Sequence, residues 1–374
     1  MIYLDYPANT PADPAVVASF ADAAIRYSGN PNAKHPAGCE AKRAMDETTA
    51  HTAALLGVLP EELIFTSGAS ESNNTAIKGL AHAYRHVGKH IITTPLEHPS
   101  VSGTLTALQE RGYEIDVVNV TPNGQIDLED LQSLLRKDTV MVTVCAVDSE
   151  LGMPQPLTEI KQLLTAFPQC KLHIDYTQAM GKIPVDLTLA DTAVFSPHKF
   201  YGLNGCGVLY KKKDVILEPL IHGGAGSTPY RSGTPAVALA VSADVALTIA
   251  LEQQNERMER VTLLHNRLTE ELKKREKVRI NSPKEALPHV INLSVAGVKG
   301  AAFRDALAKR GVCVSVKSAC SVENTPSRAV FAVSGDKKNA LSSWRIGLSH
   351  LTSEEEITEF LKIFDACYEE LKNE

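Results

Sequence analysis

Residues 193–199 read AVFSPHK, and residues 172–175 read LHID. Each stretch is a short apolar run of the kind that forms a buried strand, and each ends in a residue with chemical uses, Lys199 and Asp175 respectively. A lysine amine can hold an aldehyde cofactor as a Schiff base, and a carboxylate at the end of a neighbouring strand can keep a pyridine nitrogen protonated. Either residue alone is more often a solvated loop lysine or a turn aspartate. As a pair at two strand ends, they indicate a site for pyridoxal phosphate (PLP).

The surrounding sequence alternates between strand-like and helix-like segments. Apolar runs suited to buried parallel strands occur at residues 90–94, 114–118, 141–144 and 172–174. Helix-like segments at 127–135 and 158–166 separate them, which is an order typical of an α/β fold. Ligands of such folds gather at the carboxyl ends of the strands, where Asp175 and Lys199 fall. From about 234 to 275 the pattern predicts one long helical stretch, whose charged half connects a large domain to a smaller C-terminal one.

A further candidate feature is the turn after the apolar run ELIFT at residues 62–66. The next residues, SGASESNNTAIK at 67–78, predict a turn that opens a helix. A helix N-terminus offers unpaired backbone N–H groups and the positive end of the helix dipole, and Gly68 lets the backbone approach an anion closely. The segment is therefore a candidate phosphate cup. The alternative is that Ser67 and Ser70 only cap the helix.

Composition limits the classes of function. With 374 residues, 44% of them hydrophobic, the chain can bury a large core and is long enough for two domains. The formal net charge is −6 and no basic stripe is present, so we expect no direct nucleic-acid binding. The chain starts at Met1 without a basic and then apolar leader, and no stretch reaches the length of a membrane span. We therefore expect a cytoplasmic protein that does not associate with membranes.

The seven cysteines are irregularly spaced and form neither a metal-ligand pattern nor a disulfide framework. Cys145 and Cys313 lie in apolar runs and are expected to be small core residues. Cys320 differs, because it heads the polar segment 321–327 and follows Lys317 by three residues. Exposure and a nearby positive charge favour a thiolate. By local sequence alone, an ordinary surface cysteine remains the alternative.

Nine short motifs occur in order along nearly the whole chain, at residues 2–5, 28–31, 65–73, 97–98, 175–178, 196–199, 231–234, 318–320 and 342–345. Together they resemble the cysteine desulfurases, a family within the class V aminotransferase group of fold-type I PLP enzymes. The resemblance implies a large PLP-binding domain, residues 16–254, with a mainly parallel sheet flanked by helices. It also implies a smaller α+β domain, residues 1–15 and 255–374, that carries a reactive-cysteine loop.

The resemblance further implies a role for individual residues in a PLP site. Lys199 would hold the cofactor aldehyde and Asp175 would pair with the pyridine nitrogen. Gln178 would reach the phenolic oxygen, where Ser149 would also help to hold the cofactor and orient the substrate. The remaining implied roles are phosphate binding by Ala69, Ser70, Ser196 and His198, completed by Thr234 from the second subunit of a homodimer; ring stacking and proton exchange by His98; and substrate binding by Arg345 and Asn30.

The activity implied by the resemblance is conversion of L-cysteine to L-alanine. Lys199 would remove the α-proton of the substrate, and the Cys320 thiolate would attack the substrate sulfur and keep it as a persulfide. An acceptor protein or a small thiol would then collect the sulfur. The spacing between Cys320 and Arg345 suits the longer-loop desulfurases, which feed iron–sulfur cluster assembly or tRNA thiolation.

Some positions depart from the family pattern. Asp148 and Ser149 stand where two asparagines are usual, and the shorter Ser149 can offer only one hydroxyl. Tyr176, Pro197 and Lys317 replace small residues, and the segment 223–230 lacks a usual glutamate. These departures leave two alternatives open. One is a related PLP lyase or aminotransferase that acts on selenocysteine, cystine or another amino acid, and the other is a sulfur-relay or scaffold protein with little turnover.

Overall fold

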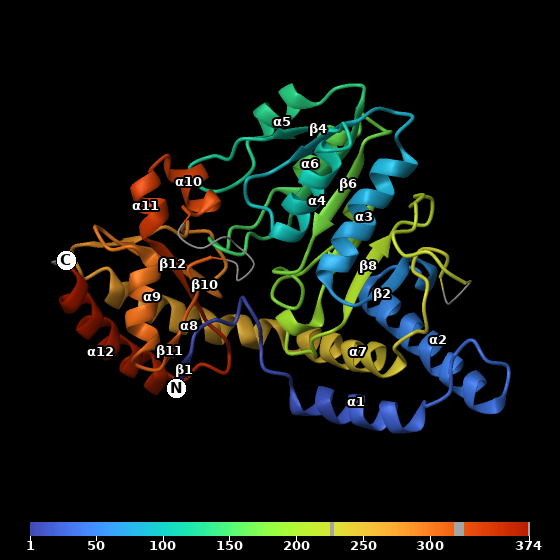
Figure 1. Cartoon of the computed structure of the whole chain (residues 1–374). Coiled ribbons are helices and arrows are strands. Elements are labelled where there is room, and N and C mark those ends of the chain that lie inside the picture. Colours follow the sequence, from blue (N-terminus) through green and yellow to red (C-terminus); the bar gives the residue numbers. More distant parts are fainter. Residues whose placement is uncertain (225–227, 318–324, 373–374) are drawn as a thin grey trace.

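The computed structural model describes residues 1–224, 228–317 and 325–372 (Figure 1). Its centre is a seven-stranded sheet in the order β2-β8-β7-β6-β5-β3-β4. The strands from β7 to β4 are parallel, and β8 is antiparallel to both of its neighbours. Their bounds are Leu63–Thr66 for β2, His90–Thr93 for β3, Glu114–Val117 for β4, Thr139–Cys145 for β5, Lys171–Asp175 for β6, Thr192–Phe195 for β7 and Gly207–Lys211 for β8. The predicted α/β fold with a mainly parallel sheet is confirmed.

Helices cover both faces of this sheet, because successive strand residues point to opposite sides. Ile91, Met141 and Val194 belong to a core shared with α3 and α4. Residues one position along, such as Ile92 and Val142, belong to a second core shared with α5, α6 and α7. The helices are α3 (Ala69–Ala83), α4 (Pro99–Gln109), α5 (Leu128–Leu134), α6 (Leu157–Leu164) and α7 (Val237–Glu252), with short 3-10 turns at Pro60–Glu62, Leu187–Leu189 and Pro197–Lys199.

The stretch expected to be one long helix is instead two helices, α7 and α8 (Gln254–Leu272), bent by 66° at Gln253. The reason lies in their compositions. The apolar α7 packs on the large sheet and contacts α1 (Pro14–Arg26) and α2 (Pro36–Leu56). The charged α8 has one apolar stripe, which belongs to the core of the C-terminal region. One straight helix cannot bury both surfaces, so the chain turns between them.

The C-terminal region has its own core. A three-stranded antiparallel sheet runs in the order β12-β10-β9, and the N-terminal β1 pairs with β11 beside it. Ile2 and Leu4 lie in this core, where the ring of Phe303 stacks on Trp344 with 5.2 Å between centroids. The elements are β1 (Ile2–Tyr3), β9 (Val278–Ile280), β10 (Val290–Val295), β11 (Val312–Cys313), β12 (Ser343–Gly347), α9 (Gly300–Ala308), α10 (Arg328–Ser334), α11 (Lys337–Ser342) and α12 (Glu354–Leu371).

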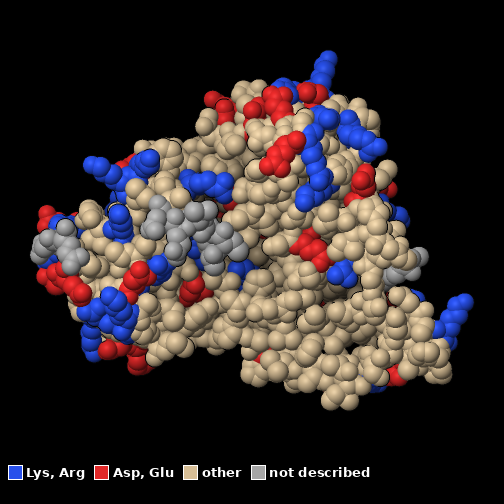
Figure 2. Space-filling model, in the orientation of Figure 1, with Lys and Arg blue, Asp and Glu red and all other residues tan. Residues whose placement is uncertain are grey.

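Two whole-molecule observations bear on the expected class of protein. Among the described residues no single helix is long and apolar enough to span a membrane, and only the bent pair of α7 and α8 passes a test of length and composition together. On the face drawn in Figure 2, positive and negative side chains are interspersed and no continuous basic stripe runs across the surface. The net charge of the whole sequence is −6.

Candidate active site

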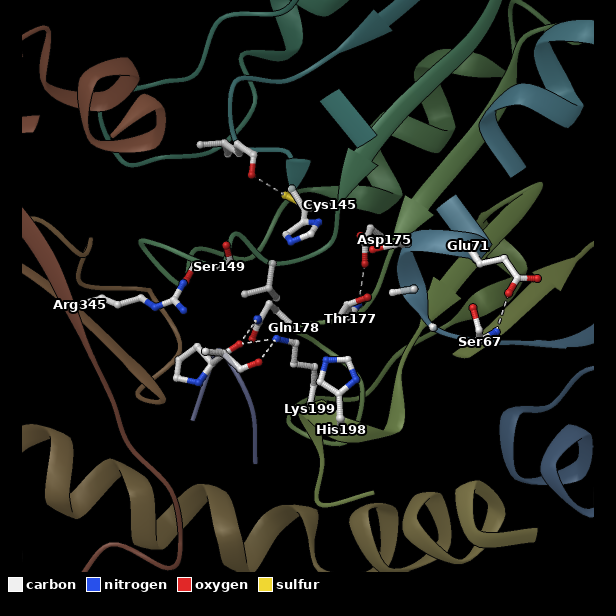
Figure 3. A pocket seen from close by; sticks show the side chains of 18 residues that line it. Ser67, Glu71, Cys145, Ser149, Asp175, Thr177, Gln178, His198, Lys199 and Arg345 are labelled. Carbon is white, nitrogen blue, oxygen red and sulfur yellow. Dashed lines mark hydrogen bonds between the residues drawn. The ribbon is translucent and has the colours of Figure 1, made fainter. Parts of the chain in front are cut away.

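A cavity of about 360 Å³ opens at the carboxyl ends of β5 and β6, between the large sheet and β12 (Figure 3). It lies where the carboxyl ends of parallel strands meet, which is the usual ligand position in such sheets. Nine of the predicted site residues line this one cavity: Ala69, Ser70, His98, Ser149, Asp175, Gln178, His198, Lys199 and Arg345.

Lys199 ends the 3-10 turn that follows β7, and its amine faces the N-terminal segment of the chain. Its Nζ donates to the carbonyl oxygens of Pro7 at 2.7 Å and Ala8 at 2.6 Å. Thr10 holds the N-terminal segment against the Lys199 turn, because its hydroxyl donates to the carbonyl of His198 at 2.9 Å. Pro7 and Ala8 also line the cavity. Sequence reasoning missed both, since a backbone carbonyl carries no sequence signal.

Asp175 closes β6 and is held by two donors. Its Oδ1 accepts from the Thr177 backbone N–H at 2.9 Å, and its Oδ2 accepts from Asn73 Nδ2 at 2.9 Å. The Asn73 oxygen in turn lies 2.9 Å from His173 Nε2, so Asn73 is fixed at both ends. A carboxylate fixed in this way points one face into the cavity and can pair with a protonated ring nitrogen. Asn73 is a supporting residue that the sequence did not single out, because an asparagine in the first helical turns has many other uses.

The predicted phosphate cup is the N-terminus of α3. The N-cap is Gly68, which offers no side chain, so the alternative in which Ser67 and Ser70 only cap the helix is wrong. The close packing of this turn on β8 requires a second glycine, because a Cβ on Gly207 would lie 2.4 Å from the Gly68 carbonyl carbon. Glu71 braces the turn by accepting from the Ser67 N–H at 2.8 Å and from Arg231 Nε at 2.9 Å. The first N–H groups of α3 therefore face the cavity without helical partners.

His98 lines the cavity from the start of α4. It is the N-cap of α4, and its Nδ1 accepts from the Ser100 N–H at 3.1 Å. Desolvation by burial lowers the pKa of the imidazole, and the charges of Lys199 and Arg345 lower it further against the opposing effect of Asp175. A neutral ring whose Nδ1 accepts must carry its proton on Nε2. His98 can therefore present an N–H group to the cavity that it lines.

Arg345 enters the cavity from β12. Only 1% of the residue is exposed, and its Nη1 donates to the Ser149 carbonyl at 2.8 Å. Its Nη2 lies 3.5 Å from an Asp5 carboxylate oxygen, and Nε has no partner among the described residues. The loop that carries Ser149 is braced from within, because the Asp148 carboxylate accepts from the N–H groups of the three residues after Ser149. Ser149 thus contributes its carbonyl to Arg345.

Glu97 is a buried carboxyl next to the cavity, and the sequence indicated it only as part of the motif at residues 97–98. It lies beneath the cavity residue Cys145, and its Oε1 accepts from the Thr94 hydroxyl and from the Cys145 N–H, both at 2.8 Å. Desolvation, with a further contribution from the charge of Asp175, raises the pKa of this carboxyl to about 8. Burial also raises the pKa of the Cys145 thiol. Cys145 is buried, as expected, but it also lines the cavity as a neutral thiol.

Three of the predicted residues that the structure describes, Ser196, Asn30 and Thr234, are not among those that line the cavity. Ser196 is fully buried behind it, with its hydroxyl donating to the Cys206 carbonyl and lying 2.8 Å from His198 Nδ1. Asn30 and Thr234 line a separate surface hollow together. Cys320 lies outside the described residues.

The departures from the family pattern are accommodated locally. The Tyr176 hydroxyl donates to the Asp186 carbonyl at 2.8 Å from a buried ring. Pro197 packs so closely on Gly202 that a Cβ at that glycine would lie 2.3 Å from the proline side chain. Lys317 donates to the carbonyl and the hydroxyl oxygen of Thr325 at 2.9 and 2.7 Å. Each side chain has a structural use outside the cavity.

Comparison with known proteins decides the family. Residues 2–360 match the family model described as "Aminotransferase class-V". The chain belongs to the class-V aminotransferase family. It is 34% identical over 375 residues to the "NifS/IcsS protein homolog" of Lactobacillus delbrueckii subsp. bulgaricus, covering 99% of this chain and 97% of that one. It is 38% identical over 365 residues to the "Cysteine desulfurase IscS" of Klebsiella pneumoniae, covering 95% and 90%.

Solved structures of class-V aminotransferase relatives agree with this assignment. A structure titled "NIFS-LIKE PROTEIN" superimposes with a TM-score of 0.93 at 33% identity, covering 99% of this chain and all of that one. Another, titled "SspA in complex with cysteine", has a TM-score of 0.80 at 30% identity and covers 94% of this chain and all of that one. Members of the family use PLP. The described cavity fits that cofactor, since it presents a lysine amine, a fixed carboxylate and an unpaired helix N-terminus.

Proposed function

We propose that the protein is a PLP-dependent cysteine desulfurase that converts L-cysteine to L-alanine. The observation that carries the proposal is that Lys199, Asp175 and Arg345, which come from three separate parts of the sequence, line one cavity. The named relatives support the choice of substrate, because they include cysteine desulfurases and a structural neighbour in complex with cysteine.

Different cavity residues would bind different groups of the cofactor. Lys199 would hold the aldehyde, Asp175 the pyridine nitrogen, and the α3 N-terminus with Ser70 and His198 the phosphate. Gln178 would face the phenolic oxygen. When bound, PLP supplies an electron sink for the carbon next to the substrate amine.

The chain's own residues then bind the substrate and move protons. Arg345 binds the substrate carboxylate as a planar pair of donors, with its unpaired Nε still available. Lys199 takes the α-proton and later returns it, and His98 holds a second proton at Nε2 beside the reacting centre. Cys320, which lies outside the described residues, receives the sulfur. In the balanced reaction, L-cysteine and the Cys320 thiol give L-alanine and a Cys320 persulfide.

The assembly is part of the proposal. Asn30 and Thr234 line a common hollow apart from the cavity of their own chain, so in a two-fold homodimer both would serve the other subunit's cavity. Cofactor affinity would then depend on dimerisation. A stable monomer that binds PLP fully would contradict this assembly.

The division into a large domain, residues 16–254, and a small domain, residues 1–15 and 255–374, is also proposed. The two cores described above support it, since Ile2 and Leu4 pack with the C-terminal elements. The sulfur acceptor is proposed to be a protein or a small thiol of the cytoplasm, in iron–sulfur cluster assembly or tRNA thiolation. The desulfurase names of the relatives support sulfur delivery in general.

Product analysis tests the proposed activity. Purified protein with PLP is incubated with L-cysteine, with and without a reductant, and alanine and sulfide are quantified. We expect alanine in both samples and multiple turnovers, with sulfide release, only where the reductant removes the persulfide. Pyruvate or a transaminated product in place of alanine would instead assign the chain to the related lyases or aminotransferases, and no product would favour the scaffold alternative.

A further inference from the structure

Behind the cavity lies a lysine that the proposed mechanism does not use. Lys182 follows the turn after β6, and its Nζ donates to Oε1 of Gln178 at 2.8 Å. The amide nitrogen of the same Gln178 donates to the Pro7 carbonyl at 3.0 Å, the carbonyl that also accepts from Lys199 (Figure 3). A chain of hydrogen bonds therefore connects Lys182 to the cavity through Gln178.

Lys182 and the Pro7 carbonyl together determine which end of the Gln178 amide faces the cavity. In its ammonium form Lys182 has three donors and no acceptor, so in that form it can bond only to the amide oxygen. With Oε1 fixed on Lys182, Nε2 must point toward Pro7 and the cavity, where its second hydrogen has no partner among the described residues. Without Lys182 only the Pro7 carbonyl would hold the amide in this orientation, and the amide would be less firmly fixed for an anionic oxygen in the cavity.

The charge of Lys182 has no structural justification of its own. In the described part of the chain no carboxylate lies within ion-pair distance of it. It lines a second cavity of about 20 Å³ that shares Pro7 and Lys199 with the first. Desolvation, followed by the charges of Lys199 and Arg345, lowers the pKa of Lys182 to about 7. The other titratable or charged groups around this small cavity are Tyr6, Tyr201, Arg257, His289 and His350.

None of these neighbours offsets a positive charge. Arg257 is a cation, and desolvation lowers the pKa of His289 to about 3 and that of His350 to about 4, so both imidazoles are neutral near pH 7. Lys211 provides the contrast. It is 3% exposed, but its Nζ donates to the carbonyls of Lys212, Lys213 and Val215 at 2.9 to 3.0 Å. Lys211 therefore stabilises its surroundings, whereas an uncompensated cation at Lys182 destabilises the fold.

We propose that Lys182 is a positioning residue for the cofactor site: it fixes the Gln178 amide with an N–H toward the cavity, ready for the anionic phenolic oxygen of PLP. The inference rests on the proposed function, because it assigns that oxygen to Gln178. It explains why an uncompensated lysine stands at this place. Loss of Lys182 weakens cofactor binding, although it relieves the apoprotein of a desolvated charge.

The first test is a double-mutant cycle on the dissociation constant of PLP, measured by reconstitution of the apoenzyme. We expect Lys182→Met to raise this constant about tenfold, as for loss of one charge-assisted hydrogen bond, and Lys182→Arg to stay within about threefold of wild type. In a Gln178→Ala background, Lys182→Met should change the constant by less than about twofold. Independent effects of the two substitutions, or unchanged affinity in Lys182→Met, would overturn the proposal.

The second readout is the unfolding temperature of the apoenzyme between pH 7 and 10. Since the unfolded lysine titrates near its ordinary pKa and the folded one near 7, the wild type loses stability relative to Lys182→Met as the pH falls across this window. The advantage of Lys182→Met should therefore be largest at pH 7, whereas the control Lys211→Met should be destabilised at every pH. A Lys182→Met protein destabilised like the control would indicate a structural role and overturn the inference. Alanine formation by the wild type tests the proposed function separately.

Discussion

Asp175 and Arg345, on opposite sides of the cavity, differ in how completely their polar atoms are paired. On the side of the large sheet, both oxygens of Asp175 accept hydrogen bonds, and Asn73 is held at both ends. On the side of β12, Arg345 is equally buried, yet its Nε has no partner among the described residues and its nearest carboxylate, Asp5, is 3.5 Å away. A fully paired buried group is fixed before a ligand arrives, whereas an incompletely paired one gains most from a ligand. The Asp175 carboxylate is therefore preorganised for the proposed cofactor, whereas Arg345 would be completed by the proposed substrate.

The largest effect is expected from removing the cofactor attachment itself. Lys199→Ala should abolish the visible absorbance of a lysine-bound aldehyde and lower turnover by at least about 10³-fold, because the site loses both its attachment point and its base. Lys199→Arg should fail as well, since a guanidinium stays protonated. Absorption spectra and alanine assays check both variants, with Lys362→Ala on the exposed face of α12 as the control. Retained absorbance in Lys199→Ala would remove the basis for the cofactor assignment.

The second-largest effect is expected from removing the residue that fixes Asp175, which should lower both the stability of the protein and its affinity for PLP. Asn73→Ala removes the hydrogen-bond partner of Asp175 Oδ2 and of His173 Nε2, so we expect a loss of about 1–3 kcal/mol in the free energy of unfolding and weaker PLP binding. Denaturant titration of the apoprotein measures the first effect and reconstitution measures the second. The half-buried Asn74 of the same helix, as Asn74→Ala, is the matched control. If Asn73→Ala matches that control in both assays, the cofactor side is not preorganised as described.

The substrate side should respond in the opposite way. Arg345→Lys keeps the charge but loses the planar pair of donors, so we expect PLP affinity to stay near that of wild type while KM for L-cysteine rises about 10- to 100-fold. Steady-state alanine kinetics and cofactor titration separate the two quantities. Loss of PLP with an unchanged KM would reverse the assignment of the two sides.

A smaller, pH-dependent effect on the unfolding temperature is expected from substitution of Glu97. Its pKa is raised to about 8 in the folded state, so folding favours the protonated form, and the stability associated with that proton is complete at pH 4 and lost as the pH rises toward 8. Glu97→Gln, which cannot ionise and keeps an oxygen for Thr94 and Cys145, should gain unfolding temperature over wild type between pH 5 and 8. A constant difference between the two proteins across this range would show that Glu97 is already ionised.

The sequence predicted the sheet and the central pair because both depend on local pattern. Apolar runs predicted the strands, and their common carboxyl edge brought Asp175 near Lys199. Arg345 was placed only through resemblance to a family, because nothing local indicates that β12 faces that edge. The bend at Gln253 was missed because the helical periodicity is continuous through it. The periodicity does not show that α7 packs in the core of the large sheet and α8 in the core of the C-terminal region.

The supporting groups were the least predictable part of the site. Pro7 and Ala8 act through backbone carbonyls, and Asn73 and Lys182 act through partners that come together only in the folded chain. Asn30 and Thr234 are the opposite case, because the sequence indicated them but they do not line the cavity of their own chain. Their motifs were recognised, but they line a hollow apart from the cavity, and the roles proposed for them would require a second subunit.

Mass spectrometry of the wild-type protein tests the central claim most directly. After PLP-loaded protein is mixed with a small excess of L-cysteine without reductant, the peptide that contains Cys320 should gain one sulfur atom, and one alanine should appear for each modified peptide. Cys320→Ser should still bind PLP and L-cysteine in the cavity but release little alanine. Alanine formation with an unmodified Cys320 peptide, or undiminished turnover in Cys320→Ser, would contradict the account.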